Sequence, residues 1–386
     1  MSATITRVHL SNWKNFRAVD VRIGPRVFIV GPNAAGKTNF LDALRFLRDI
    51  AAPEGSLVAA VKERRGLTHM RSLHARSNSN VLVEVEVVLS DDTKQWTYEL
   101  ELSGSESTKK PIRIEKERVT HGQEVLVDRP DANDTDHRLL TQTYLQQITQ
   151  SLRFRPLADT LASMVHVHVV PQLVRTPARA DQPSPRDASG SDFIDQLAQL
   201  SPAQQKRALK RIQKILRIAV PRFSELQVNR DQLGRPHLEA KYAHWRPQGG
   251  WQNEQEFSDG TLRLIGLLWA IDQGVAPLML EEPELSLHRD VIRQLPRLMT
   301  QAANRSHRQV IVATHADEML EDRGIDPSEI ILLKPSSDGT QATLGSETPA
   351  IVNAARARVP LGRLISGITK PPKIEQLALQ LQVSER

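Results

Sequence analysis

The chain has 386 residues, of which 39% are hydrophobic and 25% charged, and its formal net charge is +6. This length and composition predict one large folded domain or two to three smaller ones, and exclude disorder of the whole chain. The lack of cysteine excludes disulfides, thiolate nucleophiles, zinc ribbons and cysteine-ligated iron–sulfur clusters. Neither a signal peptide nor an apolar run of membrane-spanning length is present. We therefore expect a cytoplasmic protein without a membrane partner, and the basic balance favours an acidic partner such as nucleic acid.

The N-terminal half combines strand patterns with one clear helix pattern. Apolar alternation predicts strands within residues 3–30, the last of them the continuous apolar run Val27–Val30. A helical pattern follows from Phe40 to Leu47. The remaining predicted elements of this half are strands at residues 81–89, 96–102, 112–119, 123–127 and 164–170 and a helix at residues 139–152. The closely spaced strands between residues 81 and 127 indicate an antiparallel β region.

The C-terminal half alternates between strands and helices. Residues 175–191 are rich in Pro, Ser, Asp, Arg and Gly without periodicity, which predicts an exposed loop at a domain boundary. Residues 203–219 predict an amphipathic helix whose polar face is basic. The other predicted elements are strands at residues 226–228, 237–242, 278–280 and 310–313 and helices at residues 261–271 and 291–299. This alternation predicts an α/β fold with a mainly parallel sheet.

A phosphate-binding motif lies between the apolar run and the first helix. Its residues match G-x-x-x-x-G-K-[ST] and are Gly31, Pro32, Asn33, Ala34, Ala35, Gly36, Lys37 and Thr38, followed by Asn39. In such a loop the backbone N–H groups surround the phosphates of ATP, Lys37 reaches the β- and γ-phosphates, and Thr38 offers a hydroxyl to Mg²⁺. The alternative is an ordinary glycine-rich turn, but the strand before the motif and the helix after it favour a nucleotide site.

A second motif follows the buried strand at residues 278–280. Two carboxylates, Glu281 and Glu282, come directly after this strand. Because neighbouring side chains at a strand end point in different directions, Glu281 is expected near the Mg²⁺ and Glu282 beside the attacking water. A solvated acidic loop is the alternative, and the P-loop makes it less favoured.

The motif order resembles the ABC-type ATPase heads of the RecF, SMC and OLD branch. The residues that carry the resemblance are the Asn12–Phe16 opening, the P-loop, Phe257-Ser258-Asp259-Gly260-Thr261, the run Leu278–Glu284 with Leu287-His288, and Thr314-His315. Within this branch the chain looks like the AAA-type ATPases found beside toprim or other nuclease partners in bacterial defence loci. The resemblance implies a P-loop NTPase fold of the ABC-ATPase head type, with a mixed or parallel sheet core, an antiparallel β subdomain and a helical lobe.

The resemblance also implies roles for single residues. Glu282 would be the catalytic carboxylate, His315 the γ-phosphate sensor, and Ser258 and Gly260 the signature. Gln172 is the leading candidate for the glutamine that links the metal to the second lobe. The competitors are Gln142, Gln146 and Gln147, and a plain polar loop residue is the alternative. Glu281 departs from the family pattern, where many relatives carry Asp, and the signature lacks the second glycine of transporters.

The signature also predicts a homodimer. The helix after Gly260 rises by roughly 18 Å, so Ser258 and Glu282 are expected at opposite ends of one connecting unit. Ser258 is then expected to meet the ATP of a second subunit, so that two ATP molecules join two heads. The alternative is that Ser258 caps its own helix.

Three weaker features have other interpretations. The basic face of residues 206–217, together with Lys62, Arg64, Arg65, Arg71 and Arg76, predicts a surface for duplex DNA, unless these side chains are merely solvated. His166 and His168 share one face of a strand, which permits metal binding but is also typical of core histidines. Asp131, Asp134 and Asp136 lack a preceding apolar strand, so we expect no nuclease centre.

These observations predict an ATP-hydrolysing molecular switch that dimerises head to head and serves DNA maintenance or antiviral defence through a separately encoded effector of nuclease or toprim type. The alternatives are a nucleic-acid clamp with negligible ATP turnover and, less favoured, a transporter ATPase subunit. The expected segments are an ATPase lobe I at 1–174, a flexible loop at 175–191, a lobe II at 192–260, an ATPase core at 261–345 and a helical tail at 346–386.

Overall fold

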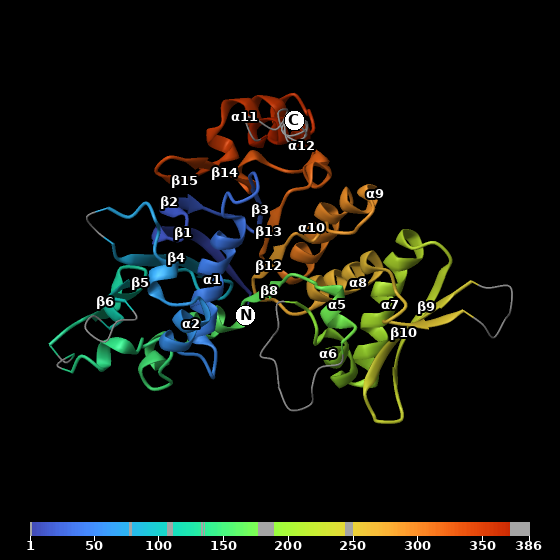
Figure 1. Ribbon diagram of the computed structural model, residues 1–386, viewed down its shortest axis with the longest axis horizontal. Helices are drawn as coiled ribbons and strands as arrows, with labels where there is room; N and C mark the ends of the chain where they lie inside the picture. The colour runs from blue at the N-terminus through green and yellow to red at the C-terminus, as the bar shows by residue number, and fades with distance from the viewer. Residues whose placement is uncertain are drawn as a thin grey trace, which may run out of the picture.

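The computed structural model describes residues 2–76, 79–105, 111–132, 134, 136–176, 189–243 and 250–370. These residues form the expected α/β architecture, with two large sheets and a separate helical lobe (Figure 1). Most of the predicted loop at 175–191 and the end of the predicted tail, residues 177–188 and 371–386, lie outside the described residues. In the described part, no helix is long and apolar enough to cross a membrane.

The central sheet contains the strand that precedes the P-loop. Its order is β15 (Gly339–Leu344), β14 (Ile330–Ser336), β3 (Arg26–Val30), β13 (Val310–Thr314), β12 (Leu278–Glu281) and β8 (Val165–Val167). All neighbouring pairs are parallel except β14 and β15. Parallel strands present their carboxyl ends at one edge, so the residues that follow β3, β12 and β13 meet there.

The second sheet is antiparallel and accounts for the β-rich N-terminal region. Its order is β2 (Phe16–Arg22), β1 (Ala3–Trp13), β4 (Val81–Leu89), β5 (Gln95–Ser103), β6 (Arg113–His121) and β7 (Glu124–Arg129). The amide of Gln309 joins it to the central sheet: Nε2 donates to Ile5 O and Gly24 O at 2.8 and 2.7 Å, and Oε1 accepts from Ile5 N at 2.9 Å. A single large apolar cluster fills the space between this sheet, the central sheet and α1 (Lys37–Ala51).

The helical lobe has its own core. It comprises α6 (Phe193–Gln199), α7 (Pro202–Ala219), β9 (Phe223–Arg230), β10 (Pro236–Tyr242), β11 (Trp251–Asn253) and the first part of α8 (Asp259–Asp272). As the period of its apolar residues predicts, α7 buries Ala208, Leu209, Ile212 and Leu216. The central helix α8 is buried along most of its length and connects the lobe to β12 (Figure 1).

Short helices complete the molecule. They are α2 (Leu57–Glu63), α3 (Leu67–Met70), α4 (Arg155–Ser163), α5 (Pro171–Val174), α9 (Arg289–Ile292), α10 (Leu295–Ser306), α11 (Pro349–Arg356) and α12 (Leu361–Thr369). The last two form the described part of the predicted helical tail, at the red end of the ribbon beyond β14 and β15 (Figure 1).

Three predicted elements are wrong in detail. Residues 139–152 form two separate 3-10 turns instead of a helix, because buried side chains bind the backbone groups that a helix would use: Arg129 donates to Leu139 O and Gln142 O, and Glu117 accepts from Tyr144 N. The predicted helix at 291–299 is broken into α9 and α10, where Pro296 lies in the first turn of α10. The predicted strand at 164–170 ends at Val167, and Pro171 begins α5.

Candidate nucleotide site

The phosphate loop connects β3 to the N-terminus of α1. Gly36 has φ of 97°, a left-handed value that suits glycine. A Cβ on Gly31 would lie 2.7 Å from Leu333 O, so this position also requires glycine. Because the loop leads directly into the N-terminus of α1, the positive end of the helix dipole faces the loop, as phosphate binding requires.

Asn15, in the turn between β1 and β2, supports this loop. Its Nδ2 donates to Ala35 O at 2.8 Å, and its Oδ1 accepts from Asn39 Nδ2 at 2.8 Å. The same amide would collide with any Cβ on Gly36, at 2.2 Å. The structure thus places the predicted nucleotide contact Asn39 against Asn15. Sequence reasoning noted Asn15 only as part of the Asn12–Phe16 opening and gave it no role.

Lys37 bends back over its own loop. Its ammonium donates to Gly31 O at 2.9 Å and Pro32 O at 3.1 Å, and it lies 3.3 Å from His315 Nδ1. Burial lowers the pKa of Lys37 to about 8, although the nearby carboxylates of Glu281, Glu282 and Glu284 act in the opposite direction. The lysine is therefore a partly desolvated cation with negative groups on one side.

Thr38 and Glu281 meet as the sequence predicts. The Thr38 hydroxyl donates to Glu281 Oε1, and His166 Nε2 contacts Glu281 Oε2 at 3.2 Å. Burial acts to raise the pKa of Glu281, but the hydrogen bonds from His166 and Thr38 outweigh it and hold the pKa below its ordinary value. A hydroxyl and an ionised carboxylate are ligands that Mg²⁺ prefers, so the pair fits this cation.

Glu282 and His315 face each other across the same edge. His315 Nε2 lies 3.4 Å from Glu282 Oε1, and Glu282 N donates to Ala313 O at 2.8 Å. Burial and the neighbouring Lys37 lower the pKa of His315, which favours a neutral imidazole. Lys37, Glu282 and His315, the three predicted catalytic residues, thus lie together.

Glu284, to which sequence reasoning gave no role of its own, orients His315. Its Oε1 accepts from His315 N and from Thr314 Oγ1, both at 2.8 Å, and its side chain is buried. Burial raises the pKa of Glu284. A carboxylate three residues after a strand end is a faint sequence signal, because only the tertiary fold brings it to β13.

The signature residues cap α8. Ser258 Oγ accepts from Thr261 N at 3.2 Å, so Ser258 is the N-cap of this helix. A Cβ on Gly260 would lie 2.4 Å from Ser286 O. The expectation that the signature and Glu282 occupy opposite ends of one unit is therefore wrong, because the loop after β12 returns to the first turn of α8.

Gln172 lies beside the signature. Its Nε2 donates to Asp259 Oδ2 at 3.4 Å, and Arg175 binds the other oxygen of Asp259 at 2.6 Å. The structure does not record a contact from Gln172 to Thr38 or Glu281 among the residues that it describes. Of the competing glutamines, Gln146 accepts from Leu57 N at 2.9 Å. Gln172 as a metal ligand stays a prediction.

The predicted basic surface is only partly exposed. Arg64 is buried and pairs with Asp42 and Asp49, each at 2.9 Å, so its inclusion is wrong. Arg71 is half-buried and donates to Gly104 O. The exposed members are Lys62, Arg65, Arg76, Lys206, Arg207, Lys210, Arg211, Lys214 and Arg217. Of the predicted acidic group, Asp134 is engaged in an ion pair with Arg129 at 2.6 Å.

Comparisons with known proteins identify the fold and the family. No curated protein matches the chain. Among solved structures, an SMC head bound to the C-terminal winged-helix domain of ScpA is 14% identical, with a TM-score of 0.56, covering 89% of this chain and 99% of that one. An SMC head with an extended coiled coil, bound to the C-terminal domain of ScpA derived from Pyrococcus furiosus, is 13% identical with a TM-score of 0.51 and covers 92% and 100%.

These likenesses show the fold of the ATPase heads. The family model described as an AAA domain, putative AbiEii toxin of a type IV toxin–antitoxin system, matches residues 26–321. This range includes the P-loop, both carboxylates, the signature and His315. The chain is therefore a member of this AAA family of ATPase domains, and its fold is that of SMC heads.

Proposed function

We propose that the chain hydrolyses ATP as a molecular switch, and that ATP binding joins two heads. The observation that carries this proposal is the convergence of Lys37, Thr38, Glu281, Glu282 and His315 at one edge of the central sheet. Lys37 and the loop would hold the β- and γ-phosphates, and Thr38 with Glu281 would hold Mg²⁺, which neutralises phosphate charge when bound. The carboxylate of Glu282 would accept the proton of the attacking water.

The geometry around Glu282 favours turnover over passive binding. Its Oε1 lies 3.4 Å from Nε2 of His315, and the backbone N–H of His315 donates to Glu284. A carboxylate held by an oriented, neutral imidazole is placed to act as a general base. This arrangement supports a hydrolase rather than the alternative of a clamp that only binds ATP.

ATP turnover by the purified chain tests this proposal. We expect hydrolysis that requires Mg²⁺ and is lost in Glu282→Gln, which keeps the size of the side chain and removes the base. ATP binding, measured with a fluorescent analogue, should survive in this variant, so that loss of turnover is not loss of the site. Turnover of the wild type no higher than that of Glu282→Gln would contradict a hydrolase and favour the clamp.

We also propose that the switch serves DNA maintenance or antiviral defence through a separately encoded effector. The exposed basic residues of α7 support DNA contact. Stimulation of turnover by duplex DNA that weakens with added salt is the expected result. Turnover indifferent to DNA would instead favour a switch that senses a protein.

A further inference from the structure

A large cavity lies where the helical lobe meets β8. It has a volume of about 920 Å³, which is in the range of small-molecule sites. Strand β8 and α4 form one wall, α8 forms another, and α6 closes the side. The residues proposed above to act on ATP and Mg²⁺, which are Lys37, Thr38, Glu281, Glu282 and His315, are not among its lining residues. The cavity therefore needs an explanation of its own.

A buried cation that pairs with no acidic side chain among the described residues lies at one side of this cavity. Arg308 is only 1% exposed. Its Nε donates to Ala276 O at 2.6 Å and its Nη1 to Ala270 O at 2.5 Å, while Nη2 has no hydrogen-bond partner among the described residues. The carbonyls of Ala270, Ile271 and Ala276 share the positive charge but do not neutralise it. Buried charges are ordinarily paired, so this guanidinium is suited to an anion.

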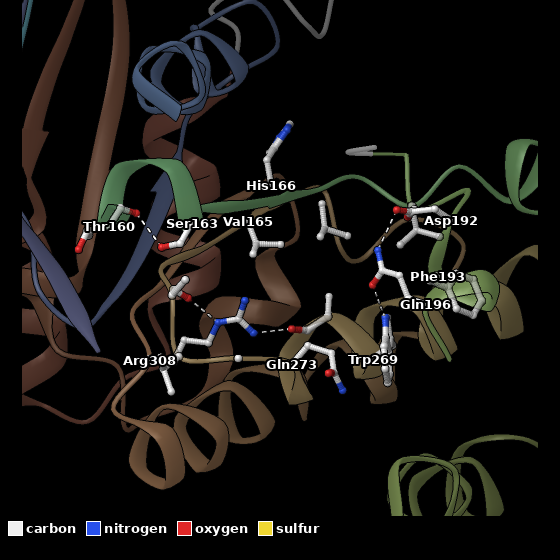
Figure 2. Close-up of a pocket in the computed structure, with 18 of the residues that line it drawn as sticks. Thr160, Ser163, Val165, His166, Asp192, Phe193, Gln196, Trp269, Gln273 and Arg308 are labelled. Atoms are coloured by element: carbon white, nitrogen blue, oxygen red, sulfur yellow. Dashed lines mark hydrogen bonds between the residues drawn. The ribbon is translucent and has the colours of Figure 1, made fainter. Parts of the chain in front are cut away.

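The rest of the cavity is mainly apolar. Figure 2 shows the guanidinium of Arg308 on one side, Trp269 and Phe193 on the other, and Val165 between them. Trp269 is held in place, because its Nε1 donates to Gln196 Oε1 at 3.1 Å and Gln196 donates to Asp192 at 2.8 Å. A rigid aromatic wall opposite the buried guanidinium edge of Arg308 fits a ligand with an apolar body and one anionic end. The other charged residues of the lining are Arg155, Asp159 and Asp192.

We propose that this cavity binds a small apolar carboxylate, whose carboxyl group meets Arg308 Nη2 and whose body packs against Val165 and Trp269. A single carboxylate matches the charge and the free N–H groups of one guanidinium edge. Burial lowers the pKa of Arg308 to about 10, so the side chain is still a cation at neutral pH.

Strand β8 connects this cavity to the nucleotide site. His166 belongs to the same strand as Val165 and Val167, and its Nε2 reaches Glu281. Figure 2 shows His166 pointing away from Arg308 and Trp269, so one short strand carries the cavity wall on one side and the cation site on the other. A ligand that displaces Val165 would therefore also displace His166.

Binding of three carboxylates, each paired with its neutral amide, tests the proposal. The probes are 2-naphthoate, indole-3-acetate and octanoate, with inorganic phosphate as a further anion, measured by calorimetry in EDTA without nucleotide. At least one carboxylate should bind at millimolar or lower concentration and at least about tenfold more tightly than its amide, which is about 1.4 kcal/mol. Because neither ATP nor Mg²⁺ is present, failure here is distinct from failure of the ATPase proposal.

Two variants locate the binding. Arg308→Met should remove the preference for the carboxylate over the amide. Since this change also removes the bonds to Ala276 and Ala270 and can impair folding, Ser163→Phe, which fills the cavity from α4 and leaves Arg308 intact, should abolish binding of the whole panel. Equal binding of carboxylate and amide, unchanged binding in Ser163→Phe, binding of inorganic phosphate as tight as that of the carboxylates, or no binding by any probe would each overturn the proposal.

Discussion

Glu282 combines an unfavourable backbone with a central position. Its φ of 45° is left-handed, a conformation that costs a non-glycine residue roughly 1–3 kcal/mol. The turn directs consecutive carboxylates to different partners: Glu281 to Thr38 and His166, and Glu282 to His315. Such strain persists only where surrounding contacts fix it, and the bond from Glu282 N to Ala313 O is one of them.

Glu284 should make stability depend on pH. Because burial raises its pKa, the folded chain holds this proton more tightly than the unfolded chain. The protonated group contributes fully to the free energy of unfolding below the ordinary Glu pKa of about 4.3. This contribution is lost as pH rises through the pKa that Glu284 has in the folded chain. Relative to wild type, Glu284→Gln should therefore gain stability as pH rises from 4.5 to 8, measured by urea unfolding.

Glu225→Gln is the matched control for this experiment, since Glu225 is an exposed residue of β9. It should leave the pH dependence of the unfolding midpoint unchanged. A Glu284→Gln protein that loses stability relative to wild type as pH rises would contradict the prediction.

At the scale of elements, sequence patterns succeed where one apolar face decides the structure. The predicted strands of the antiparallel sheet, the strands β3, β12 and β13 of the central sheet and the helices α1, α7 and α8 lie close to where their apolar periods place them, whereas β14 and β15 were not predicted and β8 is shorter than predicted. The pattern fails at residues 139–152, where Arg129 and Glu117 bind the backbone from another element, and no local signal reports such partners. Lys37, Thr38, Glu281 and Glu282 could be identified because they belong to motifs that are continuous in the sequence. The supporting contacts of Asn15 and His166 could not, because they join segments that are distant in the sequence.

The exposed basic face of α7 gives a prediction for this element. Replacing Lys206, Lys210 and Lys214 with Ala should weaken duplex DNA binding. It should also reduce the magnitude of the slope of log K against log salt by up to about 3, because each phosphate contact that is lost no longer releases a counterion on binding. Affinity measured by fluorescence anisotropy over a range of salt concentrations checks it. Arg211 and Arg217 are left unchanged because they bind Asp272 and Ser224 O.

The control for the lysine variant removes the same charge elsewhere. Arg356, Arg358 and Arg363 are exposed on and between α11 and α12, and their replacement with Ala should leave the salt dependence as it is in the wild type. An equal loss of DNA affinity in both triple variants would mean that net charge, and not the face of α7, determines binding.

At the scale of the whole molecule, the signature and the P-loop belong to different lobes. Ser258 opens α8 beside α5 and the loop after β12, while Lys37 opens α1 beside β3. If a complete site takes its P-loop from one chain and its signature from another, two inactive variants can complement each other. The proposed dimer can therefore be tested without a structure of the complex.

Mixing Lys37→Met with Ser258→Arg should restore ATP turnover. Each variant alone is expected to be inactive, whereas a mixed dimer contains one site with both residues intact, so an equal mixture should recover roughly a quarter of wild-type activity if pairing is random and the two sites act independently. Mixing Lys37→Met with Glu282→Gln is the control. Both residues reach a shared site from the same chain, so each site of this mixed dimer carries one of the two changes and should stay inactive. Recovery in neither mixture would contradict sites shared between subunits.

The order of strands in the central sheet has a consequence for synthesis of the chain. β3 lies between β13 and β14, whose residues follow it by about 280 and 300 positions along the chain. While the ribosome is still making those later segments, the apolar strand Val27–Val30 has neither of its final neighbours. Such unpaired edges are prone to association with other chains, and contacts so distant in sequence form slowly. Production of this protein should therefore respond more to chaperone supply and growth temperature than its native stability would suggest.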